Sequence, residues 1–503
     1  MMNAAGRWTH LALTVLLGAA CGPADPDLLE EESDEVVGCI ASGTEAQINA
    51  ALVGAGARAV LCPRAVFTLD NPVRFTAANQ RVYTQGLPTD GTRALLRIRS
   101  ASLTTAVDGA GRSGIWLRNV QIDGGRTALG YREGQALIVV GGAATDQLVR
   151  DIVARNTRSW STIHVFEGPV SQNTPACQRA TITANTIGPA GTADGHWADG
   201  ISLACGNSSV TNNRIQDATD GAIVIFGAPG SLIQGNSIVA SSRVLLGGIN
   251  LVDVAPVGGN YSGTRVLNNT IDARGAFIKV GVAMGASVWT CSPSVVYGAT
   301  VQGNTLRGLH FGFGYAVNGV SGFTVSGNSD QARHIGSTRA GCGGPTSQPA
   351  GFQVQAAISS DLQPEFRPGA LTYVLGVSEP PILAVLKPTA GCGFIRADQG
   401  LAPGQSFSSC DGRFLLNMQY DGNLVLYQGA TPLWATGTVG ANTAQAIMQG
   451  DGNFVTYDGA GAPLGATNTA GNPGAALAVQ DDGNLVVYSS SGQALWASNT
   501  GGR

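Results

Sequence analysis

Charge is scarce in this chain of 503 residues, and lysine is nearly absent. Only 12% of the residues are charged, the formal net charge is −4, and the two lysines are Lys279 and Lys387. A nucleic-acid-binding surface needs clustered Lys or Arg, so this composition excludes nucleic acid as a partner. Metal-ligand patterns such as HExxH or paired CxxC are missing too, so the motifs predict no metal site.

Helical periodicity is also rare. Thr44 and Gln47 form a capping-box pattern ahead of Ile48 and Leu52, and no other stretch has the spacing of an amphipathic helix. Folds that need long helices are therefore excluded. With 71 glycines and many β-branched residues, the chain is predicted to be all-β, with room for two or three domains.

The apolar run near the N-terminus is too short to span a membrane. Arg7 precedes the run at 11–17, and small residues and Cys21 follow, which is the order of an export signal at residues 1–20. LGAAC resembles the lipobox of bacterial lipoproteins, which implies lipidation of Cys21 at the cell envelope. Cleavage after Ala20 and free secretion remains the alternative. The acidic segment 21–38 is predicted to be a solvated tether, with membrane contact only through the lipid.

Cysteine parity agrees with a lipidated cysteine. Nine cysteines are present, and if Cys21 carries lipid, the other eight can pair in an oxidising compartment. Proximity along the chain suggests the pairs Cys39 with Cys62, Cys177 with Cys205, Cys291 with Cys342, and Cys392 with Cys410. The sequence does not fix this connectivity, and buried free thiols are the other interpretation.

A loose repeat occupies residues 39–345. An Asn recurs at positions 185, 213, 236, 269, 304 and 328, each time within short apolar stretches such as ATITANTIG and SVTNNRIQD. Repeats of variable length with one stacked Asn are typical of solenoid coils. This style resembles the pectin-lyase-like superfamily, which implies a right-handed parallel β-helix that acts on or near polysaccharides. Residues 346–390 are rich in proline and are predicted to be a closing segment and a stiff linker.

Candidate catalytic residues lie in two Asp-Gly sequences of this region. Asp199 and Asp220 each precede Gly and an apolar strand, and they are 21 residues apart, which is one plausible coil. Stacked in adjacent coils, the carboxylates would be about 5 Å apart, close to the spacing of a retaining glycosidase pair. Lys279 is expected on the same face, with Asp194 and His196 as substitute acid or base.

Two other interpretations of these residues stay open. A polysaccharide lyase would use Lys279 or Arg243 as the base, with Asp side chains holding Ca²⁺, and only this version requires a cofactor. Polygalacturonases have a comparable order of motifs, but this chain has Thr219 in place of a doubled Asp and no His-Gly coil before Lys279. Asp before Gly is also common in turns, so a non-catalytic solenoid is the third interpretation.

One phrase occurs three times in the last hundred residues: QYDGNLVLY at 419–427, QGDGNFVTY at 449–457 and QDDGNLVVY at 480–488. Five residue types fall on alternate positions, so an extended strand would present all five on one face. Amide, carboxylate, phenol and apolar groups together suit a sugar ring. The candidate binding residues are Gln419, Asp421, Asn423, Val425, Tyr427, Gln449, Asp451, Asn453, Val455, Tyr457, Gln480, Asp482, Asn484, Val486 and Tyr488.

These three copies match QxDxNxVxY, the signature of the bulb-type, mannose-specific lectins. The resemblance implies a three-fold β-prism over residues 391–503 with one monosaccharide site in each repeat. Trp434 and Trp496 are expected in a shared core, whereas Gly465 takes the equivalent place in the middle repeat and makes that site the weakest. The alternative is that the phrase is only a fold signature, because DGN favours a turn.

The sequence therefore predicts an exported, surface-anchored carbohydrate-binding protein. Its lectin domain is expected to bind mannose-containing glycans, and its β-helix to act on a polysaccharide in the manner of a glycoside hydrolase. A non-catalytic adhesin with a β-helix stalk is the second reading, and a polysaccharide lyase is the third. The sequence does not predict an oligomeric state.

Overall fold

The computed structural model describes residues 38–334 except 193 and 291, the short segments 337–338, 352–354, 374–378 and 387–388, and residues 391–502 except 420, 442 and 460. The predicted export signal, Cys21, most of the tether, most of 346–390 and the pair Cys291 and Cys342 lie outside these residues. No helix within the described part is long and apolar enough to cross a membrane.

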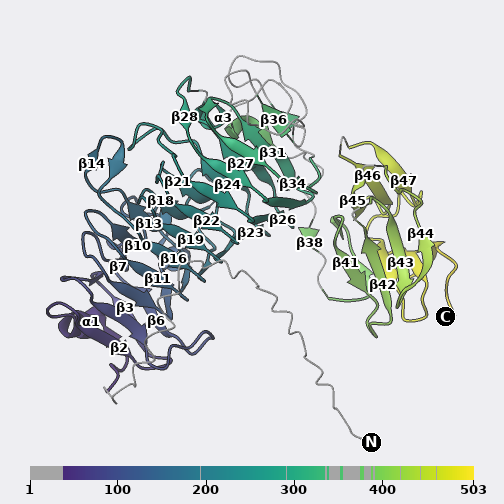
Figure 1. Cartoon of the computed structure of the whole chain (residues 1–503). Coiled ribbons are helices and arrows are strands. Elements are labelled where there is room, and N and C mark those ends of the chain that lie inside the picture. Colours follow the sequence, from purple (N-terminus) through teal and green to yellow (C-terminus); the bar gives the residue numbers. More distant parts are fainter. Residues whose placement is uncertain are drawn as a thin grey trace, which may run out of the picture. The chain divides into compact units, whose positions relative to one another are not determined.

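A right-handed parallel β-helix begins at Gly43, and successive coils contribute strands to three sheets (Figure 1). Sheet 1 contains, in spatial order, β4 (Val73–Arg74), β7 (Val107–Asp108), β10 (Ile138–Gly141), β13 (Ser161–Phe166), β18 (Asp199–Leu203), β21 (Gly221–Ile225), β24 (Leu245–Leu251), β27 (Ile278–Met284), β31 (Phe311–Val317) and β36 (Phe352–Val354). Sheet 2 contains β2 (Arg58–Leu61), β5 (Arg81–Thr84), β8 (Trp116–Arg118), β11 (Leu148–Arg150), β16 (Thr181–Thr183), β19 (Ser209–Thr211), β22 (Leu232–Gln234), β25 (Arg265–Leu267), β29 (Thr300–Gln302) and β33 (Thr324–Ser326). Sheet 3 contains β1 (Gly43–Thr44), β3 (Val66–Leu69), β6 (Ala94–Ile98), β9 (Val120–Asp123), β12 (Val153–Arg155), β17 (Thr186–Ile187), β20 (Arg214–Gln216), β23 (Ser237–Ala240), β26 (Thr270–Ala273), β30 (Thr305–Gly308) and β34 (Ser329–Asp330).

Small elements decorate the coils. They are the helices α1 (Glu45–Ala51), α2 (Arg126–Leu129) and α3 (Ala286–Thr290), the 3-10 turn η2 (Val374–Gly376), and the strand pairs β14 (Val170–Ser171) with β15 (Thr174–Pro175), β28 (Val296–Tyr297) with β32 (Val320–Ser321), and β35 (Ser337–Thr338) with β37 (Val377–Ser378). The predicted capping box starts α1, where the Thr44 hydroxyl accepts from Ala46 N and the Gln47 side chain accepts from Thr44 N. The helix buries Ile48 against the first coil, so this prediction is confirmed.

Apolar side chains of corresponding positions fill the interior of the β-helix. Ile182, Val210 and Ile233 are in register in sheet 2, and each is fully buried. In sheet 3, Ile187 is in register with Ile215 in the same manner. Stacking of apolar residues on one another removes each side chain from water, which stabilises the fold by roughly 25 cal/mol per Å² of buried apolar surface.

A ladder of asparagines lines the bend between sheets 2 and 3. Asn213 Nδ2 donates to Asn236 Oδ1 at 2.9 Å and to the carbonyl of Ile182 at 2.9 Å. Asn236 in turn donates to Asn269, and its Oδ1 also accepts from the Asn213 backbone at 3.0 Å. The same pattern joins Asn185, Asn213, Asn236, Asn269, Asn304 and Asn328. The predicted stacked Asn is therefore confirmed, and it satisfies backbone groups that a bend would otherwise leave unpaired.

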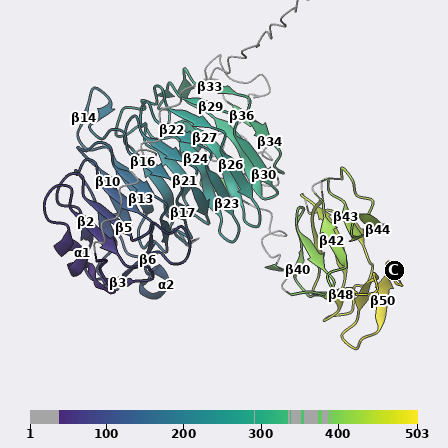
Figure 2. The ribbon, with the colours of Figure 1, turned by 60° about the horizontal axis from the view of Figure 1, so that its bottom comes forward.

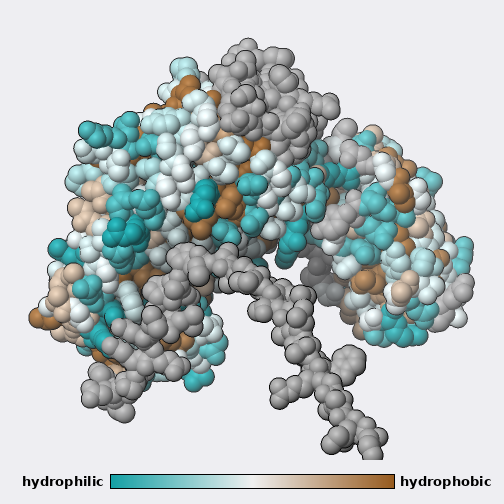
Figure 3. Space-filling view, viewed as in Figure 1, coloured by the Kyte–Doolittle hydropathy of each residue, from teal (hydrophilic) through white to brown (hydrophobic). Residues whose placement is uncertain are grey.

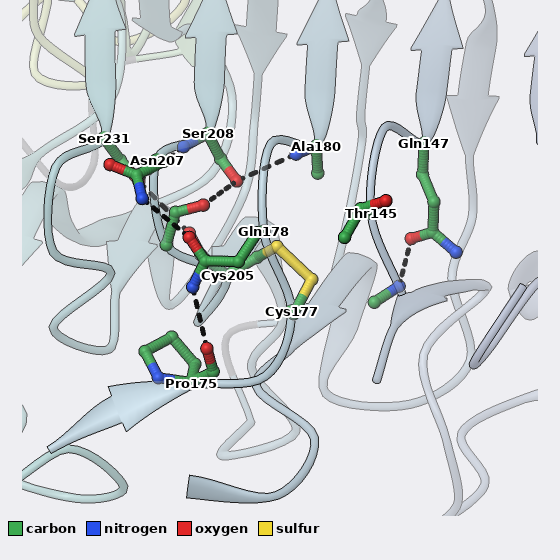
Figure 4. The surroundings of a disulfide bond; sticks show 12 residues. Thr145, Gln147, Pro175, Cys177, Gln178, Ala180, Cys205, Asn207, Ser208 and Ser231 are labelled. Carbon is green, nitrogen blue, oxygen red and sulfur yellow. Dashed lines mark hydrogen bonds between the residues drawn. A yellow bond between two sulfur atoms is a disulfide. The ribbon is translucent and has the colours of Figure 1, made fainter. Parts of the chain in front are cut away.

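Disulfides link neighbouring segments at three of the four suggested pairs. They are Cys39–Cys62, Cys177–Cys205 and Cys392–Cys410. Figure 4 shows that Cys177–Cys205 joins two adjacent coils beside a side-chain bridge, in which Asn207 donates to Gln178 Oε1 at 2.7 Å. On the face of the β-helix shown in Figure 3, hydrophilic and neutral residues predominate and hydrophobic patches are small.

The C-terminal β-prism consists of three mainly antiparallel sheets around one apolar core (Figure 2). The first contains β38 (Lys387–Pro388), β40 (Gln399–Leu401), β45 (Thr443–Met448), β46 (Phe454–Asp458) and β47 (Pro463–Ala466). The second contains β39 (Phe394–Ile395), β48 (Ala476–Val479), β49 (Leu485–Tyr488) and β50 (Ala494–Ala497), and the third contains β41 (Ser406–Ser408), β42 (Phe414–Met418), β43 (Leu424–Gln428) and β44 (Thr431–Ala435).

Replacing one central member of the ladder tests its contribution to stability. Asn236→Ala removes bonds to both neighbouring asparagines and to the carbonyl of Val210, so we expect it to lower the free energy of unfolding by about 2–4 kcal/mol. Asn328→Ala, at the last position of the ladder, is the matched control and should cost less. Urea denaturation of both variants measures the difference, and equal costs would contradict the ladder's role.

Candidate functional site

The repeated phrase of the prism is half turn and half strand. Asp421 and Asn423 lie in the hairpin turn between β42 and β43, where Gln419 N donates to the carbonyl of Asn423 at 2.8 Å. Asp421 Oδ1 closes the turn by accepting from Asn423 N at 2.9 Å. The expectation of one extended strand through all five residues is therefore wrong for the first half, because the DGN sequence forms a turn.

The turn nevertheless brings the ends of the phrase together. Gln419 Nε2 donates to the hydroxyl of Tyr427 at 2.8 Å, and the corresponding distances in the second and third repeats are 2.9 and 3.0 Å. Asp421 is exposed, Asn423 and Tyr427 are half-buried, and Val425 is buried. Asn423 Oδ1 accepts from Thr438 N at 3.1 Å, which fixes the amide. Each repeat thus combines an exposed carboxylate in the turn with an amide and a phenol that are fixed by hydrogen bonds.

The middle repeat keeps this geometry although Gly465 replaces tryptophan. Asp451 Oδ1 accepts from Asn453 N at 3.0 Å, and Thr469 donates to the carbonyl of Gly452, as the equivalent threonine does in the other repeats. Trp434 and Trp496 meet edge to face with 5.6 Å between ring centroids and pack against the core. The middle turn thus keeps the hydrogen bonds of the other repeats without a third ring.

In the β-helix, the outer face of sheet 1 carries the predicted Asp199. Its side chain is 4% exposed and accepts from Ser202 Oγ at 2.7 Å and from Gly221 N at 2.9 Å. Asn250, which is 1% exposed, lies next to it, and neither amide atom has a hydrogen-bond partner among the described residues. A Cβ at Gly221 would meet Asn250 Nδ2 at 2.7 Å and Asp199 Oδ1 at 3.4 Å, so only glycine fits between them.

Asp220 is offset from Asp199 by one position. Ile201 is in register with Ile223, so Asp199 lies beside Gly221 instead of stacking on Asp220. The expectation of directly stacked carboxylates is therefore wrong, because the register of the two strands pairs Asp199 with the residue that follows Asp220. Asp220 remains half-buried one residue earlier.

A third carboxyl, Asp253, belongs to this part of the outer face and was missed from the sequence. It follows β24, and its backbone N donates to the Tyr261 hydroxyl at 3.1 Å. Burial, with a contribution from Asp220, raises the pKa of Asp253 to about 7. Burial raises the pKa of Asp220 to about 6, and burial together with Asp220 raises the pKa of Asp199 well above its usual range. No sequence signal marks Asp253, because nothing resembling the Asp-Gly pattern surrounds it.

The other predicted residues are not brought together with these carboxyls. Lys279 is separated from Asp220 in the strand register, and His196 and Asp194 belong to a loop. Asp220, Leu246 and Lys279 take the same position in three successive coils, so Leu246 separates the cation from the carboxyl. Burial lowers the pKa of Lys279. His196 stacks on Tyr131 at 3.9 Å, and Asp194 accepts from the His196 backbone, so both shape the loop before β18.

The C-terminal coils of sheet 1 are covered on their outer face. Val280 and Phe313 pack with Val288 of α3 and with Val374 and Val377. Among the described residues, this packing covers Val280 and Phe313, whereas the outer face of the earlier coils contains the row with His164. Within the described residues, no group of three His, Cys, Asp or Glu side chains is arranged to hold a metal ion.

The chain is similar to two kinds of known proteins. A family model described as right handed beta helix region matches residues 173–330. The B-type lectin plumieribetin of Scorpaena plumieri is 38% identical over 68 residues, which is 14% of this chain and 59% of that protein. A mannose-specific lectin of Narcissus pseudonarcissus is 45% identical over 58 residues, 11% of this chain and 51% of that protein. The chain thus spans little more than half the length of these curated relatives.

Solved lectin structures are similar to a limited share of the chain. The mannose-specific agglutinin from snowdrop (Galanthus nivalis) bulbs, complexed with methyl-α-D-mannoside, is 36% identical, and the match covers 22% of this chain and 96% of the agglutinin with a TM-score of 0.19. A monomeric monocot mannose-binding lectin from Gastrodia elata is 38% identical, with coverage of 22% and 98% and a TM-score of 0.20.

The raised pKa values predict how stability depends on pH. A carboxyl whose pKa is higher in the folded state binds more protons when folded, so its contribution to stability is lost as the pH rises through the folded value. We expect the β-helix to lose stability between pH 5 and pH 7.5, on the order of 2 kcal/mol for each of Asp220 and Asp253. Thermal unfolding measured across this pH range should show that the melting temperature of Asp253→Asn falls less steeply with pH than that of the wild type.

Asp90→Asn is the matched control for this experiment. Hydrogen bonds from Thr92 lower the pKa of the exposed Asp90, so it stays ionised throughout the range. The control should keep the wild-type slope. A wild type that becomes more stable from pH 5 to pH 7.5 would contradict the assignment.

Proposed function

We propose that this chain is an exported carbohydrate-binding protein whose β-prism binds mannose-type glycans through its three repeated turns. The observation that carries the proposal is the threefold recurrence of one polar arrangement, in which a Gln-to-Tyr hydrogen bond accompanies an exposed carboxylate in the turn. The similarity to mannose-specific lectins supports mannose as the ligand class. The disulfides and the export-like N-terminal sequence support an extracytoplasmic location, with lipidation at Cys21 as the proposed anchor.

The chemistry of each proposed site follows from its groups. A carboxylate accepts two hydroxyl hydrogens of a sugar, the amide of Asn donates and accepts, and the tyrosine hydroxyl is held in place by Gln. The buried Val beside them offers an apolar contact for the C–H face of the ring. Three such sites on one rigid prism allow a branched glycan to be held at more than one point, which raises avidity without new contacts.

Substitution of the three turn aspartates tests the mannose proposal. The full chain with Asp421→Asn, Asp451→Asn and Asp482→Asn keeps an oxygen to close each turn but loses the charge. We expect mannoside affinity to fall about 10- to 100-fold, since hydrogen bonds to a charged group contribute about 1.5–3 kcal/mol. Titration calorimetry with methyl α-mannoside measures the change. The triple Ala variant should abolish binding.

Asp458→Asn is the matched control, because Asp458 also closes a hairpin turn of the prism, through Ala462 N, but lies outside the repeated phrase. It should bind as the wild type does. Undiminished binding by both triple variants would contradict the assignment of the sites.

A second proposed function is hydrolysis of a glycosidic bond on the outer face of sheet 1. It is favoured by Asp220, a half-buried carboxyl with a pKa of about 6, a value suited to general acid catalysis near neutral pH. Asp199 accepts two hydrogen bonds and is nearly inaccessible, so we assign it a positioning role. A lyase based on Lys279 is less favoured, because Leu246 separates Lys279 from Asp220.

The catalytic proposal is tested with purified full chain on a panel of polysaccharides, measuring reducing ends released. Asp220→Asn should lower kcat by at least about 100-fold, the usual contribution of general acid–base catalysis, with Asp90→Asn unchanged as the control. Activity that survives Asp220→Asn would refute this residue. No activity on any substrate would favour the alternative of a non-catalytic β-helix stalk.

A further inference from the structure

A cleft of about 600 Å³ opens on the outer face of sheet 1 at the early coils. Its floor is one row in register, formed by Arg74, Asp108, Val139 and His164 of β4, β7, β10 and β13. The residues on either side of Val139 and His164 along each strand are in the core, so this row points outward. The segment 102–105 forms a wall.

The cleft combines a ring surface with polar groups. Phe166 lies two residues beyond His164 and therefore on the same face, and the two rings are 5.9 Å apart. Trp160 meets the other side of His164 edge to face at 4.8 Å, which holds the imidazole in place. Thr104, Thr105 and Gln135 add hydroxyl and amide groups to the lining. An apolar ring surface beside hydroxyl, amide and carboxylate groups is the composition that sugar rings require.

The charges in the cleft restrict which saccharides fit. Arg74 and Asp108 form an ion pair at 3.6 Å, which leaves the Glu167 carboxylate as the excess charge of the lining. Burial lowers the pKa of His164 to about 4, so the imidazole is neutral at physiological pH, and its Nδ1 is buried without a hydrogen-bond partner among the described residues. A uronic acid chain would meet net negative charge here, whereas neutral or amino sugars would not.

We propose that this cleft is a second saccharide-binding site, separate from the turns of the prism, and that it takes a short stretch of a polysaccharide that carries no acidic groups. Phe166 supports one sugar ring, and Glu167 and Asp108 accept hydrogen bonds from its hydroxyl or amino groups. The row that forms the floor continues through Ser202, the donor to Asp199, so a chain that leaves the cleft along sheet 1 passes over the carboxyls. The binding proposal does not depend on catalysis or on mannose binding.

The test uses the full chain and hexasaccharides that contain no mannose, so that the prism sites do not contribute. Cellohexaose, xylohexaose, a glucosamine hexamer and hexagalacturonate are titrated by calorimetry, with tryptophan fluorescence as a second readout because Trp160 contacts His164. We expect binding of at least one of the first three probes and weaker or no binding of hexagalacturonate. A preference for the glucosamine hexamer would identify the amine as the recognised group, and a preference for cellohexaose or xylohexaose would identify a neutral ring.

Two substitutions locate the bound probe. Phe166→Ala should weaken binding about tenfold through loss of the ring contact, and Glu167→Gln, at a partly exposed side chain that is safe for folding, should weaken it by a few-fold. Tyr131→Ala removes an exposed ring outside the cleft and should leave affinity unchanged. The proposal is overturned if hexagalacturonate binds best, if none of the first three probes binds, or if the two cleft variants bind as Tyr131→Ala does.

Discussion

Hydrogen bonding between successive coils is the constraint on which the β-helix depends. Every strand inside the three sheets finds its backbone partners in the coil before and the coil after, so no coil is stable alone. At the bend between sheets 2 and 3 the backbone no longer takes part in strand pairing. Hydrogen bonds of the stacked asparagines join the coils there instead. Asn236 illustrates this, since its amide joins the coils on both sides and a backbone carbonyl. Among the described residues the first coil has no earlier coil to pair with, and α1 covers its core.

The same stacking determines which side chains of sheet 1 face outward. Side chains alternate between the core and the outside, so each outward row of sheet 1 lies along the β-helix axis. At the late coils this surface is apolar and is covered by α3 and the segment near Val374. At the early coils it carries Arg74, Asp108 and His164 and forms a cleft. Between the two lie the carboxyls, half-buried and shifted in pKa by their desolvation. The outer face of sheet 1 thus changes along the β-helix from a polar cleft, through the carboxyls, to a covered apolar surface.

Much of this organisation was predictable from sequence, because repetition carries it. The recurring Asn, the paired apolar positions and the phrase of the prism are periodic, and periodicity reports a regular backbone. The register between neighbouring strands does not follow from these repeats, because the coils differ in length. The one-residue offset between Asp199 and Asp220 was therefore not predicted. Asp253 was not assigned either, because its raised pKa comes from burial and from Asp220, which is far from it along the chain. In the prism, the DGN turn outweighed the alternation that suggested a continuous strand.

The asparagine stack also separates the length of a coil from its architecture. Neighbouring members of the stack are 28, 23, 33, 35 and 24 residues apart along the chain, yet their side-chain bonds have the same geometry. Residues beyond the minimum coil are accommodated in the connecting loops that rim the sheets. Insertions and deletions in those loops can therefore remodel the walls of a binding cleft while the internal spacing stays fixed. The hydrogen bonds of the asparagine stack thus fix the spacing between coils in the interior, whereas the loops at the surface are free to vary in length and composition.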